Sequence, residues 1–327
     1  MILHDVSAYG TQHCETSALG VLLRHQGLDL SEPMLFGLGA GLGFVYWDSK
    51  AMDFPFLGGR VRPFELTKNL TARLGLRLDV TETSSERKAW QQVARALDSG
   101  RPVGLQLDSA ELEYFGSGQR FGGHVVAMYG YDDEQAFLVD TEQQGGAVTT
   151  SLRSLARARA ARGPMTARNR TFTITVPDRR IDLMPLVGPA VRACAESFLN
   201  PPIANLGYRG IAKAAKLVPG WPRRSTDPAR DLPLTAMLME RAGTGGALFR
   251  NLYRDFLTEC QRYLDDAALR EGQRTYAEAA RLWSEVAESI AAGGDGDDAP
   301  LQHAGHLLTE LSSLEQHAMR TLATVTG

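Results

Sequence analysis

Cys14 is the side chain in this sequence that is best placed to act as a nucleophile. It stands at the start of a helix-like run, residues 14–23, directly after the loop 8–12. In the first turn of a helix, a thiol faces unpaired backbone N–H groups and the positive end of the helix dipole, and both favour the thiolate. Because the thiolate is the nucleophilic form, this position indicates covalent catalysis by cysteine with a base nearby.

His124 and Asp140 are the candidates for that base and for the group that orients it. His124 begins an apolar strand after two glycines, and Asp140 ends the next strand. If residues 131–133 form the turn, both lie equally far from its centre at Asp132. They are then directly opposite one another on the same face, with Cβ atoms about 5 Å apart. A carboxylate there accepts the imidazole N–H, while the other ring nitrogen faces Cys14.

This prediction of a Cys-His-Asp site depends on the hairpin register. A shift of one residue would turn Asp140 to the other face of the sheet. A single histidine in an apolar strand is, moreover, more often a hydrogen-bonded core residue than a catalytic one. We favour the catalytic interpretation because three independent features coincide: a cysteine at a helix start, a histidine at a strand start and an aspartate that faces it.

The elements that must position these residues are of mixed type in the first half of the chain. The helix begun by Cys14 runs to about His25 and ends before Gly27. A helix that carries the nucleophile, packed on an antiparallel sheet that carries its base, is an α+β arrangement. The patterns predict a second helix at 89–97 and strands at 102–108, 124–130, 134–140 and 170–176.

Beyond residue 181 the strand patterns disappear. Apolar residues recur at helical spacing in the stretches 249–263, 276–290 and 304–318, which predicts a helical bundle. We therefore expect a catalytic domain at 1–177 and a helical domain at 178–327, with the boundary within 177–186. The glycine-rich run 36–44 is interpreted as a tight loop that lines a pocket, in preference to a phosphate cradle.

Composition limits the class of protein. The 327 residues carry a net charge of -3 and are 43% hydrophobic, which is typical of a soluble globular protein and gives no reason to expect nucleic-acid or membrane binding. Three cysteines do not suggest a disulfide framework, and no signal peptide or membrane-spanning run is recognisable, so we expect a cytoplasmic protein. No grouping has metal-ligand spacing, and we expect neither a metal nor a bound cofactor.

Several motifs carry a resemblance to a known family. Near the N-terminus stand His13-Cys14-Glu15-Thr16-Ser17-Ala18-Leu19, Phe36-Gly37-Leu38-Gly39 and Gly43-Phe44. These residues resemble the N-terminal domain of the butirosin biosynthesis protein H family. The run 123–132 is similar to the histidine region of papain-like, C39-type peptidases, and residues 205–211 and 245–257 resemble the helical domain of unassigned function that often follows. The resemblance covers nearly the whole chain and implies a papain-like cysteine domain followed by a helical domain.

The resemblance implies amide-forming acyl transfer in natural-product biosynthesis. The butirosin protein moves an aminoacyl group from the phosphopantetheine thioester of a carrier protein to an aminoglycoside amine. Carried onto this chain, His124 would deprotonate Cys14, the thiolate would form acyl-Cys14, and an amine would resolve that intermediate. Asp140 would orient His124. The expected partners are an acyl carrier protein, or another thioester donor, and a small-molecule amine.

One departure from the papain-like pattern concerns the oxyanion hole. The position about six residues before the nucleophile, where such peptidases carry a glutamine, is Ala8 in this chain. The backbone N–H of Cys14 together with Gln12 could replace that donor, and an exposed or helix-capping role for Gln12 is equally consistent with its position. His13 and Tyr131 are further candidates for the oxyanion hole or the pocket wall, with a structural or pocket-lining role favoured for His13.

A stretch without acidic residues runs from 143 to 176. It could dock an acidic carrier protein or its pantetheine phosphate, but a solvated basic helix is the simpler interpretation. Its basic residues are Arg153, Arg157, Arg159, Arg162, Arg168 and Arg170.

Two other classes of function stay open at this point. A cysteine peptidase or amidase would hydrolyse a peptide or amide bond with the same residues. A non-catalytic scaffold would leave Cys14 no more reactive toward iodoacetamide than Cys194 or Cys260. The sequence names neither acyl donor nor acceptor, so a cyclase, in which the amine belongs to the donor molecule, is also consistent with it. Apolar faces in the helical half are consistent with a homodimer.

Overall fold

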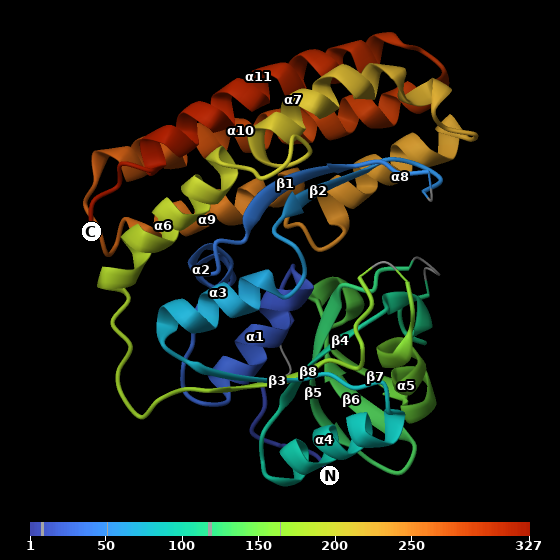
Figure 1. Ribbon diagram of the computed structural model, residues 1–327, viewed down its shortest axis with the longest axis vertical. Helices are drawn as coiled ribbons and strands as arrows, with labels where there is room; N and C mark the ends of the chain where they lie inside the picture. Colours follow the sequence, from blue (N-terminus) through green and yellow to red (C-terminus); the bar gives the residue numbers. More distant parts are fainter. Residues whose placement is uncertain (8–9, 51, 117–119, 164) are drawn as a thin grey trace. The chain divides into compact units, whose positions relative to one another are not determined.

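The computed structural model describes residues 1–327 apart from 8–9, 51, 117–119 and 164, and the chain forms two compact units (Figure 1). The first unit comprises Met1–Leu35 and Arg62–Ile181, and the second comprises Phe36–Val61 and Asp182–Gly327. The later passage between the units lies within the expected boundary region 177–186. The segment 36–61 departs from the expectation of two consecutive domains, because it packs with the helical unit.

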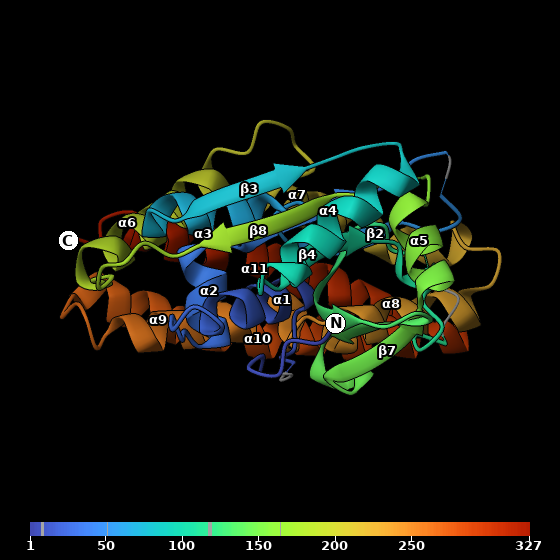
Figure 2. The same ribbon diagram turned by 90° about the horizontal axis from the view of Figure 1, so that it is seen from below.

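A six-stranded antiparallel sheet forms the centre of the first unit. Its strand order is β3-β8-β4-β5-β6-β7, and Figure 2 shows β3 and β8 side by side. The α+β class predicted from the sequence is confirmed, and β3 and β7 are strands that the sequence patterns did not reveal. The strands are β3 (Arg77–Thr81), β4 (Val103–Leu107), β5 (His124–Tyr131), β6 (Gln135–Val139), β7 (Ala147–Ser151) and β8 (Thr171–Thr175).

Helices pack on this sheet and enclose an apolar core. α1 (Cys14–Arg24) lies along β5. α4 (Glu86–Asp98) begins after Ser85, whose hydroxyl caps the helix by accepting from the Lys88 N–H at 3.3 Å. Together with α5 (Leu152–Ala160), α4 covers a core of Val93, Leu97, Val103, Leu105, Val126, Met128, Leu138 and Leu155. The unit also contains α3 (Glu65–Leu74), η1 (Ser109–Glu111) and η2 (Glu142–Gln144).

The turn between β5 and β6 lies later than predicted. The Asp132 N–H donates to the Gln135 carbonyl, and Tyr131 is paired with Ala136 inside the ladder. Residue 131 therefore belongs to the strand, and the turn predicted at 131–133 is wrong.

A β-bulge at Tyr129 offsets the effect of the later turn on the face of the sheet to which Asp140 points. After the bulge the register, continued one residue past β6, places Asp140 opposite Val126, which is two residues from His124. Residues two apart on a strand share a face, so His124 and Asp140 lie on the same face as diagonal neighbours rather than as a direct pair. With the later turn but no bulge, they would lie on opposite faces.

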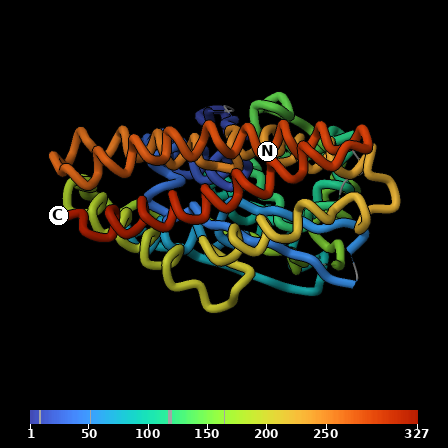
Figure 3. Tube along the Cα trace, turned by 90° about the horizontal axis from the view of Figure 1, so that it is seen from above, coloured from blue at the N-terminus to red at the C-terminus, as the bar shows by residue number. Residues whose placement is uncertain are grey.

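The second unit is a helical bundle with a two-stranded hairpin, and the predicted bundle is confirmed. α10 (Ala267–Ala292) and α11 (Ala299–Leu322) are its longest helices and run side by side (Figure 3). In the described part of the chain, no helix is both long and apolar enough to cross a membrane. The other elements are β1 (Leu42–Trp47), β2 (Phe56–Arg60), α6 (Met184–Leu199), α7 (Gly207–Leu217), η3 (Val218–Arg223), α8 (Pro228–Arg241), η4 (Ala247–Phe249), α9 (Arg250–Cys260) and η5 (Gly293–Asp295).

The glycine-rich run 36–44 is not the pocket-lining loop that the sequence led us to expect. It comprises the end of α2 (Glu32–Leu38), a turn and the start of β1. A Cβ at Gly37 would lie 2.0 Å from the ring of Phe256, so this glycine serves close packing inside the second unit. The expectation of a pocket loop is therefore wrong.

Candidate active site

Cys14 is the first residue of α1 and is held there by a carboxylate. Glu32 accepts hydrogen bonds from the backbone N–H groups of Gln12 and His13, at 3.1 and 2.7 Å. It also accepts one from the Thr16 hydroxyl at 2.8 Å. An acidic group at a helix N-terminus satisfies donors that have no partner within the helix. Glu32 therefore fixes the backbone on both sides of the thiol.

Glu15, the neighbour of Cys14, ties α1 to α3. Its side chain is fully buried. It accepts from the Phe64 N–H at 3.3 Å and from the N–H and hydroxyl of Thr67 at 3.0 and 2.7 Å. Three donors compensate a buried carboxylate for its lost hydration. The first turn of α1 is thus anchored in the interior of the unit.

The structure brings Cys14, His124 and Asp140 together. His124 Nε2 lies 2.8 Å from Asp140 Oδ2, and the same ring forms a hydrogen bond with the Cys14 side chain. Since Nε2 is engaged by Asp140, the nitrogen that faces the thiol is Nδ1. The exposed fractions are 7% for Cys14, 5% for His124 and 0% for Asp140. The three groups are therefore almost completely shielded from solvent.

The charges in this array determine where its protons lie. Burial by itself lowers the pKa of His124, but the negative charges of Asp140 and Cys14 and the hydrogen bonds to both raise the pKa to about 10. Burial raises the pKa of Asp140, but the charge of His124 and hydrogen bonds from its neighbours bring it below its ordinary value. At neutral pH His124 is therefore protonated. A protonated imidazole beside a thiol is the arrangement that stabilises a thiolate nucleophile.

The loop before Cys14 is fastened to the loop that follows Asp140. A Cβ on Gly10 would lie 2.1 Å from the Asp140 carbonyl oxygen, so only glycine permits this approach. Beside it, the Glu142 N–H donates to the Thr11 carbonyl at 2.9 Å. Two loops that are distant in the sequence therefore hold the thiol and the carboxylate at a fixed separation.

Tyr114 and Phe115 belong to the site, and sequence reasoning missed both. The Tyr114 hydroxyl donates to Asp140 Oδ2 at 2.7 Å. The Phe115 ring packs edge-on against the His124 ring, with centroids 5.2 Å apart and planes at 79°. Both residues follow η1 in a stretch without helix or strand periodicity, so no local pattern could have placed them here.

Gln12 and His13 stand in different surroundings. The Gln12 side chain is exposed, and its Nε2 donates to Glu142 at 3.1 Å. His13 is buried, with 2% of its surface exposed, and its backbone supports the helix start. Ala8 lies outside the described residues. A role for Gln12 or His13 in an oxyanion hole stays a prediction.

Tyr131 lies far from the other candidates, which corrects its assignment to the oxyanion hole or pocket wall. It ends β5, seven residues after His124, and at roughly 3.3 Å per residue the two are about 23 Å apart. Its hydroxyl donates to Asp98 at 2.9 Å, and its ring packs edge-on against Trp90. The later turn is the reason, because it extends the strand through residue 131 and away from the site.

The basic stretch 143–176 is only partly a solvated helix. Arg159 is buried, and its guanidinium donates to the Thr171 hydroxyl at 2.7 Å. Arg157 and Arg170 form ion pairs with Glu111 and Glu82. The remaining arginines, which are exposed, are Arg153, Arg162 and Arg168. Among the described residues of this stretch, the arginines therefore do not form a continuous exposed basic face.

A polar pocket of about 580 Å³ lies beside the loop that precedes Cys14. Its acidic side chains outnumber its basic one, so the electrostatic potential in the pocket is negative. Among the described residues, histidine, cysteine and carboxylate side chains do not gather in groups of three that could hold a metal ion. The pocket is lined by Ser7, Thr11, Gln12, Arg24, Asp29, Leu30, Ser31, Glu32 and Glu142.

Comparison with protein families identifies both parts of the chain. Residues 13–141 match the family model described as butirosin biosynthesis protein H, N-terminal. Residues 153–322 match the model described as domain of unknown function DUF4872. This second match spans more than half of the chain, so the chain belongs to that family. The resemblance inferred from the sequence motifs is confirmed.

Among solved structures, this chain is similar to a protein from Bacillus anthracis assigned as a C39-like peptidase. The two are 13% identical, the match covers 55% of this chain and 98% of that chain, and the TM-score is 0.38. No curated protein matches the chain. The family match, with the buried thiol and imidazole in contact, indicates a cysteine-based enzyme of the acyl-transfer or peptidase-like kind.

Proposed function

We propose that this protein is an amide-forming acyltransferase that works through an acyl-Cys14 intermediate. The observation that carries the proposal is the hydrogen-bonded array of Cys14, His124 and Asp140 in a chain whose N-terminal domain matches butirosin biosynthesis protein H. Buried ionisable groups with strongly shifted pKa values are concentrated at catalytic sites. The array therefore supports a nucleophile, a proton carrier and an orienting group.

Acylation starts from the thiolate of Cys14 and the imidazolium of His124. The sulfur attacks the carbonyl carbon of a thioester, and a C–S bond forms as the carbonyl electrons move to oxygen. When this tetrahedral intermediate collapses, the bond to the donor sulfur breaks and His124 gives its proton to the leaving thiolate. The products are a free donor thiol and acyl-Cys14.

Deacylation uses the neutral His124 that the first step leaves. An amine attacks the acyl-Cys14 carbonyl, His124 Nδ1 takes one amine proton, and the bond to the Cys14 sulfur breaks. The products are an amide, the Cys14 thiolate and the imidazolium, so the protein returns to its starting state. Throughout, Asp140 accepts from Nε2 and leaves Nδ1 to exchange protons with the reacting groups.

The oxyanion of both intermediates requires hydrogen-bond donors. The first N–H groups of a helix have no partner within it, and Cys14 is the first residue of α1. We assign the Cys14 N–H as one donor. A group whose N–H points at the developing charge without rearrangement contributes strongly to catalysis.

An amine rather than water is the acceptor that the surroundings favour. The pocket next to Thr11 and Gln12 contains the carboxylates of Asp29, Glu32 and Glu142. Negative potential raises the local concentration of a molecule that carries several amino groups. We propose this pocket as the acceptor side, and the phosphopantetheine thioester of an acyl carrier protein, by likeness to the family, as the donor.

Intact mass spectrometry tests this proposal. The purified chain is incubated with acyl and aminoacyl thioesters of N-acetylcysteamine and of pantetheine, first alone and then with small polyamines. We expect the wild type and Cys194→Ala to gain the mass of one acyl group and Cys14→Ala to gain none. Addition of the accepted amine should then remove the acyl mass and yield the amide.

The outcomes separate the classes of function. If no donor acylates the wild type and none is turned over, the covalent mechanism is wrong and a scaffold is the better interpretation. If acyl-Cys14 forms but decays to the free acid at the same rate with every amine, the protein is a hydrolase of the peptidase or amidase kind.

A further inference from the structure

Tyr114 forms a hydrogen bond to Asp140 but takes no part in the proposed reaction. We propose that Tyr114 is a positioning residue, whose hydrogen bond to Asp140 limits how strongly Asp140 holds the proton on His124; this rests on the proposed function. The Tyr114 hydroxyl donates to Asp140 Oδ2 at 2.7 Å, the same oxygen that lies 2.8 Å from His124 Nε2. The other oxygen, Oδ1, accepts from the Thr141 N–H at 2.7 Å.

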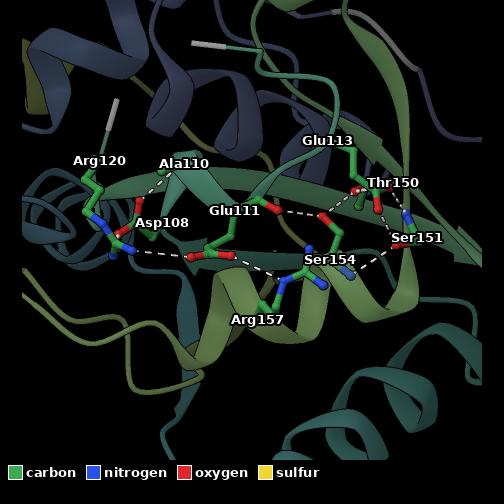
Figure 4. A network of polar contacts seen from close by, with 9 residues as sticks. All are labelled: Asp108, Ala110, Glu111, Glu113, Arg120, Thr150, Ser151, Ser154 and Arg157. Carbon is green, nitrogen blue, oxygen red and sulfur yellow. Dashed lines mark hydrogen bonds and ion pairs between the residues drawn. The ribbon is translucent and has the colours of Figure 1, made fainter. Parts of the chain in front are cut away.

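The stretch before Tyr114 is fastened to its surroundings. The Glu111 carboxylate lies 3.3 Å from Arg157 Nε on α5. The Glu113 carboxylate accepts from the N–H and hydroxyl of Ser151, at the end of β7, at 2.9 and 2.7 Å. Figure 4 shows both contacts in one network. These contacts hold the segment before Tyr114 in place, and they therefore restrict the position of Tyr114 itself.

Phe115, the next residue, touches the other member of the pair. Its ring packs edge-on against His124, while the Tyr114 hydroxyl meets Asp140. One short segment therefore makes a polar contact with the carboxylate and an apolar contact with the imidazole. Both contacts act on the position and the proton of His124.

The hydrogen bond from Tyr114 acts on His124 through the charge of Asp140. A donor to a carboxylate stabilises its negative charge and lowers its affinity for a second proton donor. Without the hydroxyl, the negative charge of Asp140 would attract the His124 N–H more strongly, and His124 would hold its proton more tightly. This matters because His124 must give its proton to the leaving thiolate during acylation.

The pH dependence of Cys14 alkylation by iodoacetamide, followed by intact mass, measures this effect. The reactivity of the Cys14 thiolate changes when the neighbouring His124 loses its proton, so a more basic His124 moves this alkaline step of the rate profile to higher pH. In Tyr114→Phe we expect the midpoint of the alkaline step to move up by roughly half a pH unit or more. Tyr129→Phe removes the same atom from β5 outside the array and should leave the midpoint unchanged.

A second substitution reverses the sign. With 3-fluorotyrosine at position 114 the hydroxyl is a stronger donor of nearly the same shape, and the midpoint of the alkaline step should move down. A merely structural role predicts no such pair of opposite shifts. The fluorotyrosine variant also tests the inference by itself if Tyr114→Phe does not fold.

Failure of the inference differs from failure of the proposed function. If wild type, Tyr114→Phe and the fluorotyrosine protein share one midpoint of the alkaline step, Tyr114 does not act on His124 and the inference is overturned, while the proposed function is untouched. If wild-type Cys14 reacts no faster than Cys194 and Cys260 at any pH, the proposed function fails and the inference fails with it.

Discussion

At the scale of single residues, the proton on His124 governs the proposed chemistry. The sequence led us to expect a neutral imidazole that deprotonates Cys14. In the structure, the imidazole is buried between Asp140 and Cys14, and their negative charges raise its pKa to about 10 despite its burial. The proton therefore already resides on His124 before substrate arrives, and in the proposed reaction this residue acts first as an acid.

Replacement of Asp140 by asparagine tests the source of that proton. An amide carries no charge, so burial would dominate and the pKa of His124 would fall toward or below its ordinary value of about 6.5. We expect the alkylation rate of Cys14 at pH 7 to drop by roughly ten- to a hundredfold. Asp132→Asn, in the exposed turn after β5, is the matched control and should react like the wild type. Equal rates in both variants would contradict the role of Asp140.

The same shift makes stability depend on pH. A group whose pKa is raised in the folded state stabilises the fold fully below its unfolded pKa of about 6.5, and this contribution is lost as pH rises through the folded value. For His124 that window extends to about pH 10. Between pH 6.5 and 10, the free energy of unfolding should therefore fall more steeply for the wild type than for His124→Gln. Urea titrations across this range measure the difference, and parallel curves would exclude it.

At the scale of elements, two backbone features bring the reacting groups together. The bulge at Tyr129 returns His124 and Asp140 to one face of the sheet. The loop before α1 passes against the backbone of Asp140, which leaves no room for a side chain at position 10. The first feature pairs His124 with Asp140, and the second brings the start of α1, with Cys14, to that pair.

Gly10→Ala tests the loop contact. The added Cβ would lie 2.1 Å from the Asp140 carbonyl oxygen, which is backbone and cannot yield like a flexible side chain. We expect a loss of about 2 kcal/mol or more in the free energy of unfolding and slower alkylation of Cys14. Gly20→Ala is the control, since its Cβ would meet only the end of the Arg24 side chain in the middle of α1, and it should stay within about 1 kcal/mol of the wild type. Equal effects of the two changes would refute the contact.

At the scale of the whole molecule, the helical unit contains its own buried charges. Arg250 and Glu315 are both fully buried, and Nε and Nη2 of the arginine each lie 2.9 Å from a carboxylate oxygen. Arg250 also donates to the Leu248 carbonyl at 2.8 Å. That carbonyl belongs to the turn 245–249, in which every residue has a positive φ. The ion pair thus fastens a strained, left-handed turn to α11, and its role is structural.

Loss of one partner of this pair should weaken the helical unit. In Glu315→Gln, a buried guanidinium loses its counter-charge, and we expect a loss of about 3–5 kcal/mol in the free energy of unfolding of this unit. The double variant Arg250→Met with Glu315→Leu removes both charges and should recover much of that loss. Glu285→Gln removes the same charge from an exposed pair with Arg281 on α10 and should have little effect. Urea unfolding followed by helical circular dichroism measures all three.

Much of this organisation could be predicted from local patterns. Apolar spacing identified the helices around residues 89–97, 276–290 and 304–318, and alternation identified the hairpin strands. The stretch 36–61 could not be assigned to the helical unit from the sequence. The local pattern of a strand pair and a glycine-rich turn does not indicate which part of the chain they pack against. Tyr114 and Phe115 were missed for the same reason, since their partners come from other strands.

The sequence by itself identified the candidate nucleophile, base and carboxylate, and it determined the α+β and helical halves, because residue type, helix-start position and periodicity are local properties of the chain. Only the tertiary structure decided which residues surround Cys14. The hairpin register depended on one bulge, Tyr131 was carried away from the site by a longer strand, and Tyr114 reached Asp140 through a fold of the loop after η1. These outcomes follow from packing and hydrogen bonding between distant segments, whose energies no local pattern encodes.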